Sequence, residues 1–204
     1  MFSLPDVPMN SSALPIASAS TTAVLTVQEF LDRYERGERT FESLSLRSAI
    51  LRETRLPGLN LGLADFIGAD LSTATWPSST LIEACFSGAL LWRTDLSGSL
   101  LIRSNFTRSV LIRANFSQSN CLQASFAHAD MRLIHLEGAD LTGANLVGVD
   151  LRFAHLSGTN FTDANLTGAN LTGSDLSHAN LSNATLTHAQ LDRINWTGCT
   201  RTQS

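Results

Sequence analysis

An apolar residue occupies every fifth position of this chain from Phe41 to Trp196, and the register does not slip over 32 consecutive positions. A second series, of small residues, stands two positions before each of these from Ala64 to Ile194 and consists mostly of Ala, Ser and Thr. The position between the two series is most often Asp or Asn. A period of five fits neither an α-helix at 3.6 residues nor a strand at two. The pattern therefore predicts a solenoid, in which coils of a short repeat stack on one another.

The most regular stretches of the repeat are ADLTGANL at 139–146 and ANLTGANL at 164–171. Both match the motif A(N/D)LXX, and the chain resembles the pentapeptide repeat family over about four-fifths of its length. The resemblance implies an all-β fold, a right-handed quadrilateral β-helix in which four pentapeptides make one coil. The large and the small residue of each pentapeptide then point into the core. The 32 pentapeptides make about eight coils, and at a strand spacing of about 4.8 Å the rod is about 38 Å long.

Four segments follow from this pattern along the chain. They are a disordered Ser/Ala/Pro-rich tail (1–25), an N-terminal capping helix with an entry turn (26–40), the pentapeptide repeat solenoid (41–196) and a C-terminal tail (197–204). The first coil is degenerate, since Leu44 and Thr54 stand at small positions. Residues twenty apart should stack in adjacent coils. One side of the core is therefore predicted to carry a ladder of four rings, from Phe66, Phe86, Phe106 and Phe126.

A short α-helix is predicted immediately before the first coil. Thr26 and Glu29 have the spacing of a capping box, and Gly37 is a suitable stop. An amphipathic helix at this place would cover the open end of the solenoid, where strand edges are otherwise unpaired. The segment EFLDRYERGERTF, which contains this helix, is similar to the entry segment of cyanobacterial pentapeptide repeat proteins, including the kind that modulates heterocyst development.

Charge and cysteine content narrow the function classes. All 14 basic residues are Arg, and 18 acids bring the net charge to −4. Direct nucleic-acid binding, which needs a strongly basic face, is therefore not expected. The three cysteines, Cys85, Cys121 and Cys199, form neither a disulfide framework nor a zinc motif, so the sequence predicts a cytoplasmic location. The N-terminus shows no signal peptide or membrane span, and no membrane association is expected.

Most outward positions hold Ser, Thr, Gly, Asn or Asp, and the exceptions cluster in the middle of the chain. LLWR at 90–93, LLIR at 100–103 and VLIR at 110–113 are ten residues apart and so alternate between two opposite faces. Exposed Trp and Arg beside aliphatic residues are typical of a protein contact surface. The predicted partner-binding residues are Leu90, Trp92, Arg93, Val110, Ile112, Arg113, Arg132, Leu133, Arg152 and Phe153. The opposite face carries Ile82, Leu100, Ile102 and Leu122, with Glu83 beside Arg103.

Two structural explanations of these exposed residues remain open at this point. Branched and aromatic residues suit strands, and the stems of arginines can lie over them. Arg132 and Arg152 also lie close to Asp130 and Asp150, so local ion pairs are an alternative to partner binding.

No catalytic chemistry is predicted, and the protein is not expected to be an enzyme. The Asp/Asn positions recur in more than half of the repeats, so the coil itself explains them. His135 and His155 should stack on one face, but the sequence shows no third convergent ligand, and no metal or other cofactor is expected. No phosphate-binding loop or nucleophile motif is present.

A rigid scaffold for protein–protein interaction, with a regulatory role, is the first functional hypothesis. The alternative comes from the family resemblance: some pentapeptide repeat proteins mimic DNA and inhibit gyrase, and such mimics dimerise end to end through the C-terminal coil. Ile194 and Trp196 are the candidate residues of such a homodimer end, although arginines in the middle of the rod argue against mimicry. Binding of ice through outward threonines is a weaker hypothesis, because Thr142, Thr162 and Thr172 form short rows on different faces.

Overall fold

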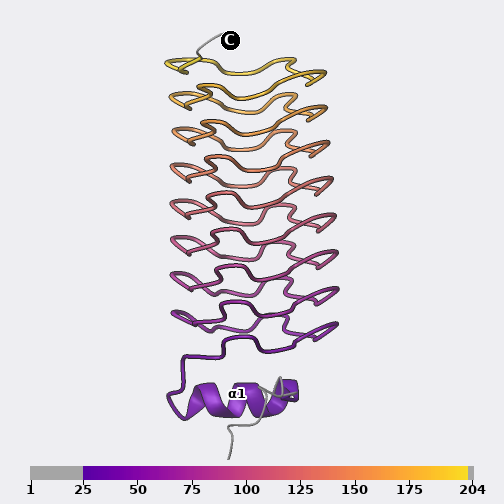
Figure 1. The fold of residues 1–204 in the computed structure, drawn as a ribbon, viewed down its shortest axis with the longest axis vertical. Coiled ribbons are helices and arrows are strands. Elements are labelled where there is room, and N and C mark those ends of the chain that lie inside the picture. Colours follow the sequence, from indigo (N-terminus) through magenta and orange to yellow (C-terminus); the bar gives the residue numbers. More distant parts are fainter. Residues whose placement is uncertain (1–24, 202–204) are drawn as a thin grey trace, which may run out of the picture.

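The computed structural model describes residues 25–201, which form one helix followed by a long stack of coils (Figure 1). Helix α1, Val27–Glu35, lies across the N-terminal end of the stack, and the C-terminus lies at the far end. The predicted tail 1–25, apart from Leu25, and the last three residues of the predicted tail 197–204 lie outside the described residues. Within residues 25–201, no helix has the length and apolar character needed to cross a bilayer.

The predicted capping box begins α1. Thr26 Oγ1 accepts a hydrogen bond from the Glu29 backbone N–H at 3.2 Å, and Glu29 Oε2 accepts one from the Thr26 backbone N–H at 2.8 Å. Two backbone donors that the first turn leaves without helical partners are thereby satisfied. The apolar face of α1 buries Phe30 completely, and its ring meets Phe41 of the first coil edge-on at 4.8 Å. The helix thus closes the N-terminal end of the core.

Parallel backbone bridges between residues twenty apart hold the coils together. The series that starts at Thr40 and ends at Thr200 contains eight successive bridges, so each coil has twenty residues and contains four turns. Pairing thus begins one residue before the predicted solenoid and continues four residues past Trp196, into the segment predicted as a C-terminal tail.

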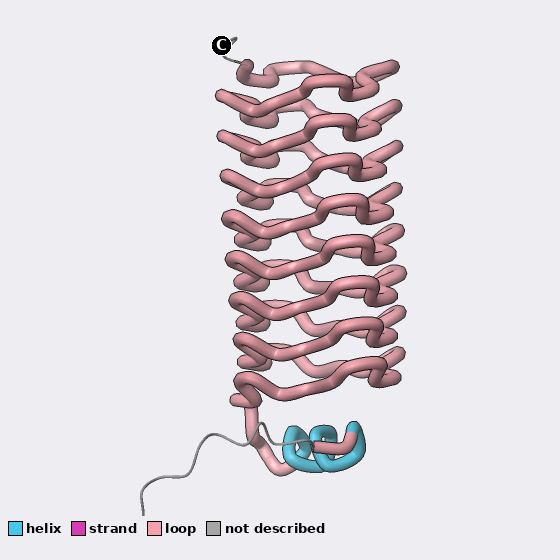
Figure 2. The backbone as a smooth tube through the Cα atoms, turned by 45° about the vertical axis from the view of Figure 1, so that its right-hand side comes forward, coloured by secondary structure: helices cyan, strands magenta, loops and turns pink. Residues whose placement is uncertain are grey.

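The expected strands do not form among the described residues, where the ladder consists of isolated bridges (Figure 2). The reason is the short period. A turn occupies two of every five residues, and the second turn residue has a left-handed backbone, as at Thr73 (φ 59°) and Phe153 (φ 57°). Only one residue between successive turns pairs with the next coil, which is too little for a continuous strand.

Each Asp or Asn that precedes a core residue has a structural task in the turn. Its Oδ1 accepts the backbone N–H two residues further on, at 3.0 Å for Asp95, 3.1 Å for Asn115 and 3.0 Å for Asp175. Such a bond stabilises a turn by holding the backbone in place. The Asp/Asn preference of the repeat is therefore explained by the coil rather than by catalysis.

The core confirms the predicted ring ladder. Phe66, Phe86, Phe106 and Phe126 are fully buried, and successive rings stack at 4.7, 4.7 and 5.0 Å with interplanar angles of 1–3°. Cys121 also occupies a core position, where burial raises the pKa of its thiol to about 12. The thiol therefore remains neutral and serves as a small apolar group.

One departure of the first coil from the repeat, Thr54, has a physical explanation in the next coil. Trp76 is completely buried, and its indole N–H donates to Thr54 Oγ1 at 3.0 Å. The Thr54 hydroxyl in turn donates to the Leu51 carbonyl at 2.8 Å. A small apolar residue at position 54 would leave the buried indole donor without this partner, so Thr at this position fits the neighbouring Trp.

Candidate functional site

Seven of the ten predicted partner-binding residues line one groove of about 380 Å³ on the middle coils. We call it the central groove, and its lining residues are Trp92, Ile112, Arg113, Arg132, Leu133, Arg152 and Phe153. They come from four successive coils, since the first turn position recurs every twenty residues. Of the remaining predicted residues, Leu90 and Val110 are paired with each other by a parallel bridge, and Arg93 follows Trp92; none of the three lines the groove.

The large side chains of the groove stand at turn positions that favour smaller residues. Arg113, Leu133 and Phe153 have left-handed backbones with φ of 57°, 58° and 57°. A residue with a Cβ is strained in this conformation, and glycine, which occupies the same turn position at Gly143 and Gly173, is not. Large side chains at these turns are therefore present despite a local conformational cost.

Phe153 is held against the following coil although 53% of its surface is exposed. A Cβ built on Gly173 would lie 2.7 Å from the Phe153 ring, so the ring covers the backbone of that glycine. The absence of a side chain at Gly173 is what allows this packing, and it sets the direction of the ring.

Arg132 and Arg152 are neutralised by local carboxylates. Arg132 Nε lies 2.8 Å from Asp130 Oδ1, and Arg152 Nη2 lies 2.7 Å from Asp150 Oδ2. Burial raises the pKa of Asp150, but hydrogen bonds from the Arg152 side chain and backbone and the charges of Arg152 and Arg132 outweigh it, and the pKa lies below its ordinary value. The local ion pairs that the sequence left open as an alternative are thus present.

Arg113 differs from these two arginines. Within residues 25–201 its guanidinium has no ion pair, hydrogen bond or ring contact, and it is exposed. Arg93 instead lies over the Trp92 ring at 5.1 Å from the centroid, and Trp92 itself is 40% exposed. The central groove therefore presents apolar surface together with one positive charge that is available to a partner.

The opposite face carries the predicted ion pair and a second hollow. Arg103 Nε donates to Glu83 Oε1 at 2.9 Å, as expected from their stacking. A hollow of about 260 Å³ lies towards the N-terminal coils and is lined by Glu42, Asn60, Gly62, Leu63, Thr80, Ile82 and Glu83. Of these lining residues, sequence reasoning singled out Ile82 and Glu83 and missed Leu63. The available signal was a leucine at a left-handed turn position, where it is 57% exposed.

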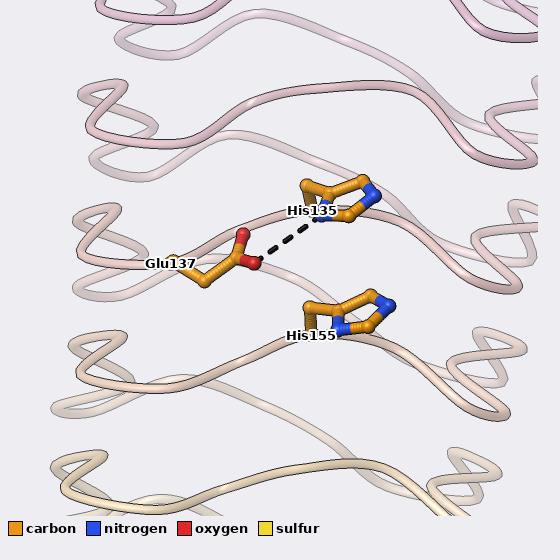
Figure 3. Close-up of side chains that lie close together, drawn as sticks. All are labelled: His135, Glu137 and His155. Atoms are coloured by element: carbon orange, nitrogen blue, oxygen red, sulfur yellow. Dashed lines mark hydrogen bonds and ion pairs between the residues drawn. The ribbon is translucent and has the colours of Figure 1, made fainter.

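Three potential metal ligands, His135, Glu137 and His155, lie close together on two adjacent coils, shortly after the groove residues in the chain (Figure 3). The imidazoles of His135 and His155 stack at 4.4 Å with an interplanar angle of 2°, as predicted. His135 Nδ1 lies 3.2 Å from Glu137 Oε1. Glu137 is the third group that the sequence analysis did not find, although it stands only two residues after His135. A ligand atom from each residue lies within 4.8 Å of the other two.

The C-terminal coil leaves its core partly open. Leu186, Leu191, Ile194 and Trp196 are partly buried, whereas the equivalent residues of the preceding coils are buried. The Arg201 guanidinium lies over the Trp196 ring at 4.4 Å and covers part of it. The predicted dimer residues Ile194 and Trp196 therefore lie at an incompletely covered end of the rod.

Comparison with known families accounts for the five-residue period. A family described as pentapeptide repeats matches eight copies in segments 84–120, 119–158, 144–183 and 179–200. These segments together cover residues 84–200, which is more than half of the chain. The chain belongs to the pentapeptide repeat family. Membership in this family implies a right-handed β-helix for the stack of coils described above.

Solved pentapeptide repeat structures resemble this chain over most of its length. HetL, which is involved in heterocyst differentiation regulation in the cyanobacterium Nostoc sp. strain PCC 7120, is 28% identical, with 86% of this chain and 94% of HetL covered and a TM-score of 0.36. Two trypsin-treated forms of QnrB1, a plasmid-mediated fluoroquinolone resistance protein, are each 19% identical. Their TM-scores are 0.54 and 0.56, with 79% and 81% of this chain and 91% and 89% of theirs covered. Among curated protein sequences, none matches this chain.

Proposed function

We propose that this pentapeptide repeat protein is a non-enzymatic scaffold with a regulatory role, and that its central groove binds a segment of a partner protein. The observation that carries the proposal is a coincidence of two features. Arg113, Leu133 and Phe153 are large residues at successive left-handed turn positions of one row, and all three line the apolar central groove. The Asp and Asn side chains of the repeat make turn hydrogen bonds, which supports a non-enzymatic role.

The chemistry of the groove defines the partner segment. Trp92, Leu133 and Phe153 offer apolar contact surface, and Trp92 is of the residue type most enriched at binding hot spots. Arg113 offers a planar group with several donors, which suits a carboxylate. The expected segment therefore carries apolar side chains next to an Asp, a Glu or a C-terminal carboxylate. Because the groove is built on stacked coils, the protein itself loses little conformational entropy when the segment binds.

The functional test compares two double variants on opposite faces. Trp92→Ala with Arg113→Ala removes groove contacts, and Leu100→Ala with Arg103→Ala is the matched control, since Leu100 is 41% exposed and Trp92 is 40% exposed. A displayed peptide library is selected on the wild-type protein, and the dissociation constants of the enriched peptides are measured for all three proteins. The groove variant should bind at least about thirtyfold more weakly, which corresponds to about 2 kcal/mol. The control should bind like the wild type.

Selection results can contradict the proposal in two ways. If the enriched peptides lack acidic groups, Arg113 does not bind a carboxylate of the partner segment. Equal affinity for the wild type and the groove variant would place binding elsewhere on the rod. Thermal melts of both variants accompany the binding data, because a large loss of stability in the groove variant would show that these side chains serve the fold.

DNA mimicry is the second candidate function, and it is suggested by the family rather than by this surface. A mimic of DNA presents acids where phosphates would lie, whereas the middle of this rod presents Arg93 and Arg113 without carboxylate partners among residues 25–201. We therefore expect no inhibition in a gyrase supercoiling assay at micromolar protein. Strong inhibition would favour the mimic over the scaffold.

The proposal also includes a location and an assembly. A cytoplasmic role suits three free thiols, at Cys85, Cys121 and Cys199. An end-to-end homodimer through Ile194 and Trp196 would bury the incompletely covered C-terminal coil and pair its exposed backbone edge.

A further inference from the structure

The row that contains His135 and His155 breaks the rule of the coil at two successive positions. Asn115 precedes the pair in this row and Asp175 follows it, and both accept the backbone N–H two residues further on. An imidazole stands where this carbonyl or carboxylate oxygen would be, and neither histidine makes the equivalent bond to residue 137 or 157. Two turn-stabilising bonds are thus exchanged for two imidazoles, which the coil itself does not require.

The exchange places three donor groups of matching chemistry together. The parallel bridge between His135 and His155 puts the two rings in adjacent coils at 4.4 Å. Glu137 turns a carboxylate oxygen towards His135 Nδ1 at 3.2 Å (Figure 3). Two imidazole nitrogens and one carboxylate oxygen form a donor set that binds Zn²⁺ in proteins, at about 2.0–2.2 Å from the metal.

A neighbouring side chain holds the carboxylate in an orientation that suits a ligand. Ser117 Oγ donates to Glu137 Oε2 at 3.0 Å, which leaves Oε1 as the oxygen that faces the imidazole. Metal-binding side chains in proteins regularly accept or donate such a hydrogen bond through an atom that does not bind the metal. The bond fixes the orientation of the coordinating group.

The present spacing allows closure around an ion with small side-chain rotations. Ligand atoms that share one Zn²⁺ lie about 3–4 Å apart, given bonds of about 2.1 Å, and the three groups here lie within 4.8 Å. The side chains of His135 and Glu137 are 44% and 38% exposed, so no packed core opposes the required rotation.

We propose that His135, Glu137 and His155 form a surface binding site for a divalent transition metal ion, with Zn²⁺ as the ion that fits the donor set best. The ion joins two adjacent coils, and three protein ligands leave a fourth coordination position open to solvent. The site lies next to the central groove in the chain, because each histidine follows a groove residue, Leu133 or Phe153, by two positions.

The repeat itself supplies test variants that should fold. His135→Asn and His155→Asn each introduce the residue that the coil prefers at this position and restore the turn bond. Glu137→Gln removes the carboxylate charge and keeps its shape. The matched control is His178→Asn, which changes an outward histidine that packs over Gly198 and lies outside the cluster. All proteins carry no His tag and are freed of metal before titration.

Isothermal titration with ZnCl₂ measures stoichiometry and affinity for the full chain. The wild type and His178→Asn should bind one ion per chain. Each cluster variant should bind at least about tenfold more weakly, since even changes behind the ligands cost about 10–100-fold. Zinc should also raise the Tm of the wild type and leave that of His155→Asn nearly unchanged, because only a ligand bound to the folded state stabilises it.

Three results would overturn the proposal. The first is no binding by the wild type at about 100 μM zinc, a concentration about a hundredfold above a micromolar Kd. The second is equal affinity for the wild type and the three cluster variants. The third is a thiolate-to-metal charge-transfer band when Co²⁺ replaces Zn²⁺, which would assign the ion to a cysteine instead. Melts in EDTA show whether each variant is folded, so a loss of binding with an unchanged melt supports the site.

Discussion

Phe106 lies in the middle of the ring ladder, and Phe106→Ala should strongly destabilise the solenoid. Its side chain is fully buried between Phe86 at 4.7 Å and Phe126 at 5.0 Å, and Phe116 meets it edge-on at 5.5 Å. The substitution removes a ring with three aromatic neighbours from a core where each coil contacts only the coils above and below it. Phe86 and Phe126, which both stack on this ring, are then separated by a cavity.

The expected magnitude follows from burial and from the cavity. A Phe→Ala change in a packed core costs about 3–5 kcal/mol, because the transfer free energy of the ring and the cost of the cavity add. The aromatic contacts contribute about 0.5–1.5 kcal/mol per pair beyond burial. The rigid coils cannot collapse into the gap without breaking their bridges, so we expect the upper half of the range, about 4–5 kcal/mol. With a slope of about 2 kcal/mol per molar urea, the midpoint falls by about 2 M.

Urea unfolding followed by circular dichroism tests this value, with Phe106→Leu as the matched control. Leu146 follows the ring ladder on the same side of the core, so the coil accommodates Leu at this position. The control leaves a smaller cavity and should cost about 1–2 kcal/mol. A loss below about 1 kcal/mol for Phe106→Ala, or equal losses for Ala and Leu, would show that the ring does not carry the packing described here.

Three further perturbations address the first coils and the C-terminal end. Thr54→Val should cost about 1–3 kcal/mol in urea melts because it leaves the buried indole N–H of Trp76 unpaired, and an unchanged midpoint would contradict the 3.0 Å bond. Burial raises the pKa of Asp70, but hydrogen bonds from Arg52 and Ser72 outweigh it and hold that pKa below the ordinary value of 3.8. The ion pair of Asp70 with Arg52 therefore contributes stability above pH 3.8, and this stability is lost as the pH falls through the lowered pKa. On acidification, the Tm of Asp70→Asn should fall less than that of the wild type. Equal decreases in Tm would show that this ion pair does not contribute to stability. Sedimentation at micromolar concentration should show a dimer that Trp196→Glu converts to a 22.0 kDa monomer, and a wild-type monomer would exclude the end-to-end contact.

The five-residue period was sufficient to predict which residues form the core. In a solenoid each coil repeats the geometry of its neighbour, so residues twenty apart in the chain are neighbours in space. The order of residues alone was therefore enough to predict the ring ladder and the stacked pair His135 and His155. It also placed most of the central groove residues on one face. The capping box at Thr26 was equally accessible, because it depends only on a local spacing of three residues.

Side-chain direction and the partner of each polar group required the tertiary structure. The period places Arg113 and Arg132 on one face, but only the rotamers show that Arg132 pairs with Asp130 while Arg113 stays free of carboxylates within residues 25–201. The same holds for Glu137, whose carboxylate turns along the coil towards His135. Continuous strands, which the all-β expectation implied, are not seen within residues 25–201, because a left-handed residue in every turn limits pairing to single bridges. A repeat of backbone geometry thus determines positions, whereas rotamers and hydrogen bonds, which vary from coil to coil, determine the chemistry of the surface.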